Sequence, residues 1–140
     1  MKVLVTGGLG TVGTSLVTEL ESRGHDVWIC DISHYHSAKY IRCDVASFHQ
    51  LARIFEKHSF DYVYHLAAEF GRWNGEDYYD TLWRTNMIGT KNVIRLQEKH
   101  GFRMVFFSSS EVYGDYDGVM VEDVMDKTEV RQLNDYAMTK

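Results

Sequence analysis

The sequence predicts an α/β fold in which a doubly wound parallel sheet carries helices on both faces. Segments of strand character alternate with segments of helical periodicity along the 140 residues, which is the pattern of parallel strands joined by helices. The apolar runs at 2–6, 62–66 and 102–108 are nearly continuous, as in strands that are buried on both faces. Right-handed crossovers between such strands produce a doubly wound sheet.

The elements are expected in a regular order. Strands are predicted at 2–6, 26–30, 40–43, 62–66 and 102–108, and helices at 11–23, 48–58 and 79–100, with another beginning near Asn134. Val12, Leu16 and Leu20 share one face of the first helix, and Gly24 follows its end, where glycine is common. Ser47 is expected to cap the second helix. Segments 69–77 and 114–133 are predicted to be loops.

Length, charge and composition exclude several classes of protein. The chain has the length of one domain, and a net charge of −5 without a basic cluster argues against a nucleic-acid partner. No apolar run is long enough for a transmembrane helix. Cys30 and Cys43 are expected to be free thiols in a reducing cytoplasm. The histidines lack metal-ligand spacing, so no metal site is predicted.

A glycine-rich loop, Thr6-Gly7-Gly8-Leu9-Gly10-Thr11-Val12-Gly13, joins the first strand to the first helix. Gly7 allows a tight turn, Gly10 lets the backbone approach a diphosphate, and Gly13 allows close packing of the helix. The free amides of Thr11 and Val12 at the helix N-terminus suit phosphate groups. The strand before the loop and the helix after it favour dinucleotide binding over a purely structural turn.

Asp31 is predicted to select the dinucleotide. It ends the second strand, 18 residues after Gly13, where a carboxylate bonds the ribose hydroxyls of NAD. The same carboxylate would repel the 2′-phosphate of NADP, so NAD is the expected cofactor. An ordinary strand-end aspartate is the alternative interpretation.

Six ordered motifs carry a resemblance to a known family. They are the Gly7 to Gly13 loop, Cys43-Asp44-Val45, His65-Leu66-Ala67-Ala68, Asn86-Met87-Ile88-Gly89-Thr90-Lys91-Asn92, Ser108-Ser109-Ser110-Glu111-Val112-Tyr113-Gly114, and Tyr136-Ala137-Met138-Thr139-Lys140. With these motifs the chain resembles the N-terminal part of an extended short-chain dehydrogenase/reductase of the nucleotide-sugar epimerase, dehydratase and decarboxylase type.

The resemblance implies further cofactor contacts. Asp44 and Val45 would read the adenine, and Leu66, Ala67 and Ala68 would pass beneath the cofactor. Asn86 would have an active-site or water-holding role. Its alternative is a buried amide that bonds to neighbouring backbone.

Tyr136 and Lys140 form the implied catalytic pair. They are four residues apart and share one face of a helix. A lysine cation beside a tyrosine favours the phenolate, so Tyr136 becomes a general base for a sugar hydroxyl. By resemblance, Lys140 also holds the nicotinamide ribose. Without the other motifs, an exposed helical pair would be the better interpretation.

The serine run carries the remaining catalytic prediction. If Val112-Tyr113-Gly114 is the anchor, the family's catalytic Ser/Thr position falls on Ser109. The pair Ser110-Glu111 resembles GDP-mannose dehydratases and UDP-glucuronate decarboxylases, whereas plain 4-epimerases usually lack the glutamate. Glu111 is either a base beside a transient ketone or a residue that caps backbone or pairs with a lysine.

The sequence therefore predicts a cytoplasmic, NAD-dependent epimerase or dehydratase. It would act on a nucleotide sugar through transient oxidation by Tyr136 and NAD, and the alternatives are a decarboxylase or a non-catalytic dinucleotide-binding fragment. Residues 1–140 would form the NAD-binding Rossmann domain, truncated after the Tyr-x-x-x-Lys motif and lacking the C-terminal substrate domain. The resemblance allows a homodimer. In the loop 69–77, Arg72 and Trp73 would contact a sugar or nucleotide, or lie in a plain surface loop.

Overall fold

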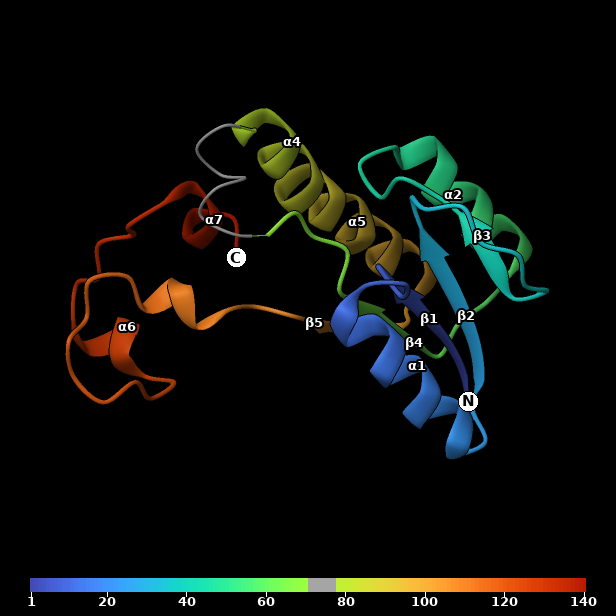
Figure 1. Cartoon of the computed structure of the whole chain (residues 1–140), viewed down its shortest axis with the longest axis horizontal. Helices are drawn as coiled ribbons and strands as arrows, with labels where there is room; N and C mark the ends of the chain where they lie inside the picture. The colour runs from blue at the N-terminus through green and yellow to red at the C-terminus, as the bar shows by residue number, and fades with distance from the viewer. Residues whose placement is uncertain (71–77) are drawn as a thin grey trace.

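Five parallel strands form one sheet, as the sequence predicts. The computed structural model describes residues 1–70 and 78–140. The strands are β1 (Lys2–Thr6), β2 (Asp26–Asp31), β3 (Tyr40–Arg42), β4 (Tyr62–His65) and β5 (Arg103–Phe106). Their order across the sheet is β3-β2-β1-β4-β5, so the chain reverses direction of winding at β1 (Figure 1). Crevices for ligands form at such a reversal, outside the carboxyl ends of the strands.

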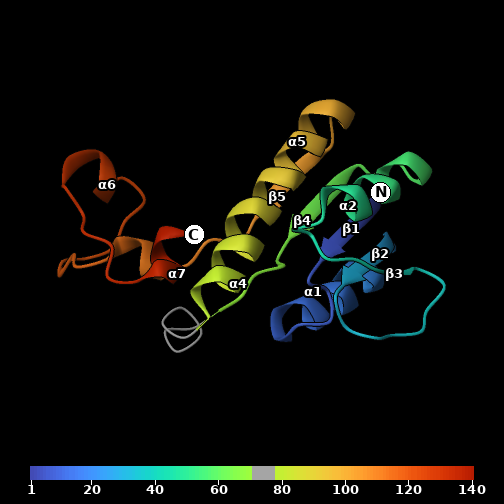
Figure 2. The same cartoon turned by 90° about the horizontal axis from the view of Figure 1, so that it is seen from above.

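Helices cover both faces of the sheet. Figure 2 shows α1 (Thr11–Ser22) on one face and α2 (Phe48–Lys57) with α5 (Thr90–His100) on the other. Because side chains alternate along a strand, β1 serves both layers. Val3 and Val5 pack in the core under α1, and Leu4 packs in the core under α2 and α5.

The long helix predicted over 79–100 is present but is not uniform. It consists of α4 (Tyr79–Trp83), a π-helical segment η1 (Arg84–Gly89) and α5. α5 ends at Gly101, which has φ 74. A side chain at Gly89 would lie 2.7 Å from Val45, so η1 packs closely against the loop after β3. A π-turn within a helix is uncommon and is often found at functional sites.

Three details differ from the sequence-based expectations. β5 is shorter than the predicted strand 102–108, because its partner β4 ends at His65, which pairs with Phe106. The side chain of Ser47 caps no amide of α2; the Ser47 carbonyl accepts from Leu51 instead. The tail predicted to be loop contains a short helix, α6 (Val124–Lys127), and the serine run forms a 3₁₀ turn, η2 (Ser110–Tyr113).

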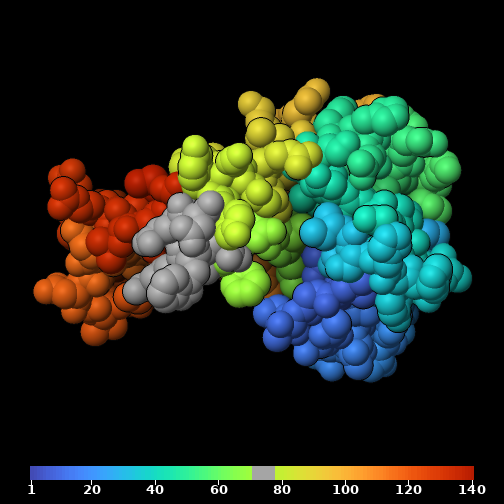
Figure 3. Space-filling model, turned by 45° about the horizontal axis from the view of Figure 1, so that its top comes forward, coloured from blue at the N-terminus to red at the C-terminus, as the bar shows by residue number. Residues whose placement is uncertain are grey.

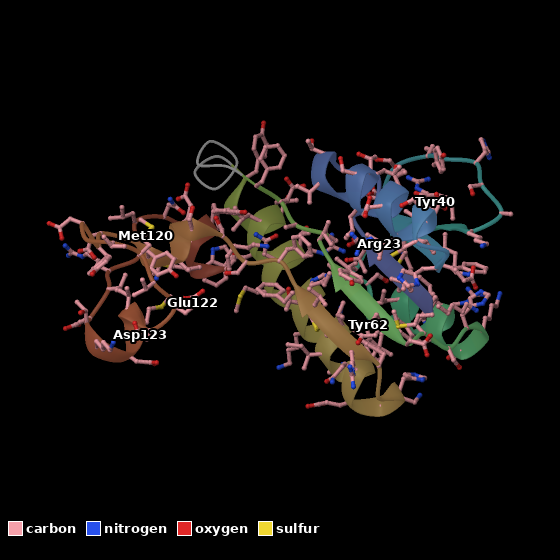
Figure 4. The ribbon with its side chains drawn as sticks, turned by 90° about the horizontal axis from the view of Figure 1, so that it is seen from below. Arg23, Tyr40, Tyr62, Met120, Glu122 and Asp123 are labelled. Atoms are coloured by element: carbon pink, nitrogen blue, oxygen red, sulfur yellow. The ribbon has the colours of Figure 1, made fainter. Side chains whose placement is uncertain are left out.

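The chain after β5 extends away from β2 and β3 and then returns. Figure 3 shows this segment gathered at one end of the molecule, and Figure 4 places Met120, Glu122 and Asp123 far from Arg23 and Tyr40. The last helix, α7 (Asp135–Met138), lies beside α4. Its N-cap is Asn134, whose side chain accepts a hydrogen bond of 2.7 Å from the Ala137 amide. This return brings the C-terminal residues to the edge of the sheet.

Candidate functional site

A cavity of about 630 Å³ lies at the carboxyl ends of the central strands. This is where parallel α/β sheets bind ligands. Its wall combines the loop after β1, the end of β2, the segment after β3, the segment after β4, the end of β5 and the last helix. The predicted site residues in this wall are Gly7, Gly10, Thr11, Val12, Gly13, Asp31, Asp44, Val45, Leu66, Ala67, Ala68, Tyr136 and Lys140.

The glycine loop is shaped as the sequence predicts. Gly7 has φ 68, and a Cβ there would lie 2.7 Å from the Ala67 nitrogen. A Cβ at Gly13 would lie 2.4 Å from the Gly7 oxygen, so only glycine lets α1 pack this close to the loop. A Cβ at Gly10 would lie 3.3 Å from its nearest neighbour, the Gly7 oxygen, and Gly10 lines the cavity. Gly7 and Gly13 therefore fix the loop, and Gly10 leaves the approach open.

The N-terminus of α1 opens into the cavity without a cap. Gly10 precedes the helix and offers no side chain, and the first turn holds no acidic residue. The amides of the first helical residues have no acceptor within the helix, and Thr11 and Val12 line the cavity. Free amides and the positive end of the helix dipole attract phosphate oxygens. This wall therefore fits the diphosphate of a dinucleotide.

Asp31 stands beside the glycine loop. Its Oδ2 accepts from the Leu9 amide at 3.1 Å and its Oδ1 accepts from the Ser33 amide at 3.2 Å. The carboxylate is thus held between the glycine loop and the end of β2, and it lines the cavity. Its position and charge suit ribose hydroxyls and oppose an added phosphate.

Asp44 and Val45 form the wall beyond Asp31. Asp44 Oδ1 accepts from the Ala46 amide at 2.9 Å, and its Oδ2 pairs with Arg84 at 2.9 Å. Val45 is buried. The site therefore places a fixed acceptor next to an apolar surface.

Cys30 and Cys43 complete this part of the wall as free, buried thiols. The side chain of Cys43, burial and the charge of Asp31 raise the pKa of Cys30 well above its ordinary value. Cys30 is therefore an uncharged thiol and contributes an apolar surface.

The floor of the cavity, formed by residues 66–68, rests on a buried hydrogen-bond network. Thr6 Oγ1 accepts from the Ala67 amide at 3.3 Å and bonds His65 Nδ1 at 2.7 Å, while His65 Nε2 bonds Thr90 Oγ1 at 3.0 Å. His65 is 1% exposed. Burial, with the charge of Lys140 as a smaller cause, lowers the pKa of His65 to about 4. His65 is therefore a neutral structural residue at pH 7.

Tyr136 and Lys140 enter the same cavity from the last helix. The helix predicted to carry both ends at Met138, so Lys140 lies just beyond it. Lys140 Nζ lies 4.9 Å from the centre of the Phe106 ring. Burial lowers the pKa of Lys140. The pair stands at the β5 side of the cavity, opposite Asp31.

The serine run is divided by the turn η2. Ser108 lines the cavity, and its Oγ donates to the Lys140 carbonyl at 3.2 Å. Ser109 Oγ accepts from the Glu111 amide at 3.3 Å, and Glu111 Oε2 accepts from Asn134 Nδ2 at 2.8 Å. Among the predicted residues, Ser109 and Glu111 thus lie outside the cavity wall. Ser108 was not predicted, although it ends the apolar run 102–108, where a strand meets the site.

Asn86 is buried and does not line the cavity. Its Oδ1 accepts from the Glu69 amide at 2.9 Å, and its Nδ2 donates to the Glu69 carbonyl at 3.0 Å. This geometry is that of the buried amide bonded to backbone, and the cofactor contact stays a prediction. Arg72 and Trp73 lie outside the described residues.

Two features are absent from residues 1–70 and 78–140. No group of three or more His, Cys, Asp or Glu side chains is arranged to hold a metal ion there. In the same residues no helix has the length and apolar character to cross a membrane.

Comparison with known proteins places this chain in a family. Residues 3–140 match the profile of the NAD dependent epimerase/dehydratase family, in agreement with the resemblance carried by the six motifs. A 2-alkyl-3-oxoalkanoate reductase from Stenotrophomonas maltophilia (strain K279a) is 37% identical over 122 residues, which are 80% of this chain and 34% of that protein. A UDP-N-acetyl-alpha-D-glucosaminuronate decarboxylase from Bacillus cytotoxicus is 32% identical over 123 residues, which are 81% of this chain and 38% of that protein.

A solved structure shows the same fold. It is a UDP-glucose-4-epimerase from Stenotrophomonas maltophila with bound NAD and formylated UDP-arabinopyranose. The TM-score is 0.85 at 26% identity, covering 100% of this chain and 45% of that one. The chain thus spans about a third of the length of these curated relatives and under half of this solved chain.

Gly13→Ala should destabilise the fold by about 1–3 kcal/mol, because the added methyl group meets the Gly7 carbonyl. Gly10→Ala is the matched control and should cost less than about 1 kcal/mol, since its nearest neighbour is farther away. Chemical denaturation followed by circular dichroism measures both. Equal losses for the two variants would contradict the assigned roles.

Stability should fall as the pH falls from 7 to 5. His65 has a folded-state pKa of about 4 against an ordinary 6.5, so the unfolded chain binds the proton first and the stabilisation present above pH 6.5 is lost on the way to pH 4. Between pH 7 and pH 5 the free energy of unfolding should fall by ~2 kcal/mol through His65.

Denaturation of His65→Gln at both pH values isolates the effect, with exposed His36→Gln as control. The His36 variant should keep the wild-type pH dependence and the His65 variant should lose most of it. Parallel curves for all three proteins would show that His65 is not the responsible group.

Proposed function

The chain belongs to the NAD dependent epimerase/dehydratase family, and we propose that its cavity binds NAD and serves the transient oxidation of a nucleotide sugar. The observation that carries the proposal is the uncapped N-terminus of α1, open to a cavity that Asp31 also lines. That combination provides amides for a diphosphate and a carboxylate for a ribose. Bound NAD would supply a hydride acceptor that can later return the hydride.

The chain's own residues divide the proposed work along the cavity. The amides of Thr11 and Val12 bind the diphosphate, and Asp31 accepts from the adenosine ribose. Asp44 and Val45 receive the adenine, on the side where Asp44 is fixed by Arg84. The floor segment 66–68 lies beneath the cofactor. This order leaves the nicotinamide end to Tyr136 and Lys140.

Tyr136 is the proposed general base. It removes a proton from a sugar hydroxyl while the carbon of that hydroxyl loses hydride, and it returns the proton when the sugar is reduced again. Lys140 lines the same cavity and would bring a positive charge to this end of it. Ser109 is the hydroxyl that the motif assigns to the reacting oxygen, and Ser108 is the hydroxyl that lines the cavity. Both are therefore included in the test.

The substrate class rests on the relatives. The decarboxylase and the epimerase reported above act on UDP-sugars by their names, and the Ser110-Glu111 pair favours a dehydratase or decarboxylase over a plain 4-epimerase. A second candidate is a reductase, because the 37% identical relative is named for 2-alkyl-3-oxoalkanoate reduction. The proposed activity is that of a protein as long as these relatives, of whose length this chain covers about a third.

Asp31→Ala should weaken NAD binding by about tenfold or more, because a charged acceptor for the ribose is lost. The preference for NAD over NADP should also relax. Isothermal titration calorimetry with both dinucleotides measures the two effects, and Asp117→Ala, an exposed change in the tail, is the control. An unchanged ratio of NAD to NADP affinity would remove Asp31 from the site.

Tyr136→Phe should lower turnover of a UDP-sugar by about 100-fold or more, because proton transfer is lost. NAD affinity should stay within about twofold of wild type, as the phenyl ring remains. Conversion of UDP-glucose or UDP-glucuronate to product, followed by NMR, provides the assay. Tyr113→Phe is the matched control.

Ser108→Ala and Ser109→Ala should be compared in the same assay. The motif predicts that Ser109→Ala lowers turnover, and the larger loss identifies the hydroxyl that contacts the reacting oxygen. NAD binding without turnover of any UDP-sugar would contradict the nucleotide-sugar proposal and favour the dinucleotide-binding alternative.

A further inference from the structure

The helix that carries Tyr136 cannot hold its own position. α7 has four residues, and an isolated helix of one turn is not stable in water. The contacts of α7 with the rest of the chain therefore decide where Tyr136 and Lys140 lie. Figure 1 shows α7 next to α4, and the two elements are in contact.

Two hydrogen bonds join α7 to the long helix, one on each side of Tyr136. Trp83 Nε1 donates to Asp135 Oδ2 at 3.0 Å. Asn86 Nδ2 donates to Thr139 Oγ1 at 2.9 Å. The acceptors immediately precede Tyr136 and Lys140 in the sequence. Both reactive side chains are thus next to an anchored residue.

The bond between Asn86 and Thr139 is the more buried of the two. Asn86 is 2% exposed and Thr139 is 4% exposed. Thr139 Oγ1 also donates to the Tyr136 carbonyl at 2.9 Å, so this hydroxyl joins Asn86 to the backbone of Tyr136. A buried polar group that loses its partner is costly, which makes this arrangement hard to replace by another.

The same asparagine also fixes the floor of the cavity. Its amide makes two bonds to the backbone of Glu69, which lines the cavity together with Ala67 and Ala68. One side chain in the π-turn η1 therefore connects the floor to the segment that carries Tyr136. The distance between floor and Tyr136 is set through Asn86 and Thr139.

We propose that Thr139 and Asp135 are positioning residues that hold Tyr136 and Lys140 at the nicotinamide end of the cavity. Neither lines the cavity, and each acts through the reactive residue that follows it. Asn86 and Trp83 are their anchors on the long helix. This inference rests on the proposed binding of NAD. It requires that loss of the Thr139 hydroxyl disturbs the nicotinamide end and leaves the adenine end intact.

The test compares two probes of different length, NAD and ADP, by titration calorimetry. ADP would reach only the glycine loop, Asp31 and the proposed adenine contacts Asp44 and Val45. NAD would also reach Tyr136 and Lys140. Thr139→Val removes the hydroxyl and keeps the shape, so it should weaken NAD by about 3- to 10-fold and leave ADP within about twofold. Thr139→Ser keeps the hydroxyl and should restore the wild-type ratio. Exposed Thr81→Val in α4 is the control.

The second bond supplies an independent variant if Thr139→Val does not fold. Asp135→Ala and Trp83→Phe should each reduce the ratio of NAD to ADP affinity, and the double variant should lose no more than the larger single loss, because both changes remove one bond. An additive double variant would contradict a direct role for this bond.

The outcomes separate the inference from the proposed function. Equal weakening of NAD and ADP in Thr139→Val, an unchanged NAD affinity, or failure of Thr139→Ser to restore the ratio would overturn the positioning role. If the wild-type chain binds both ADP and NAD, and Thr139→Val does not change the ratio of the two affinities, the positioning role fails and the proposed function stands. A wild-type chain that binds neither probe overturns both.

Discussion

The packing of the first helix against the glycine loop is the constraint on which the site depends. At Gly13 the helix lies so close to Gly7 that a side chain would overlap the Gly7 carbonyl. This contact aims the unsatisfied amides of α1 along the carboxyl edge of the sheet. Because the strand order reverses at β1, the same edge opens a crevice there. The proposed diphosphate contact therefore depends on backbone geometry, with few side chains required.

The floor of the cavity and the last helix are held by polar groups that do not line the cavity. Thr6, His65 and Thr90 connect β1 and β4 to the long helix beneath the floor. Asn86 makes the corresponding connection between the floor and the last helix. Both networks are buried, where hydrogen bonds fix geometry most firmly. The floor and the segment that carries Tyr136 are thus both bonded to the same long helix.

Local patterns predicted the strands, the glycine loop and Asp31, because each depends on residues that are close in sequence. Other features depend on where the tail returns, which no local pattern contains. Ser108 bonds the Lys140 carbonyl, and Glu111 meets Asn134, only because the chain after β5 folds back. The buried residues Leu82, Asn86, Gly89 and Val93 keep a helical spacing through the π-helical segment η1, and no proline marks a break, so the sequence predicted a uniform helix. Ser47 has the residue type of a cap, yet its side chain caps nothing in the folded chain.

An NMR titration of the ¹⁵N-labelled chain with NAD tests the central claim most directly. If the diphosphate binds at the uncapped helix, the amide signals of Thr11, Val12 and Gly13 should shift most, together with those around Asp31. Signals of α6, far from the cavity, should stay unchanged. Binding that leaves the first turn of α1 unshifted would contradict the account, because the dinucleotide would then lie elsewhere.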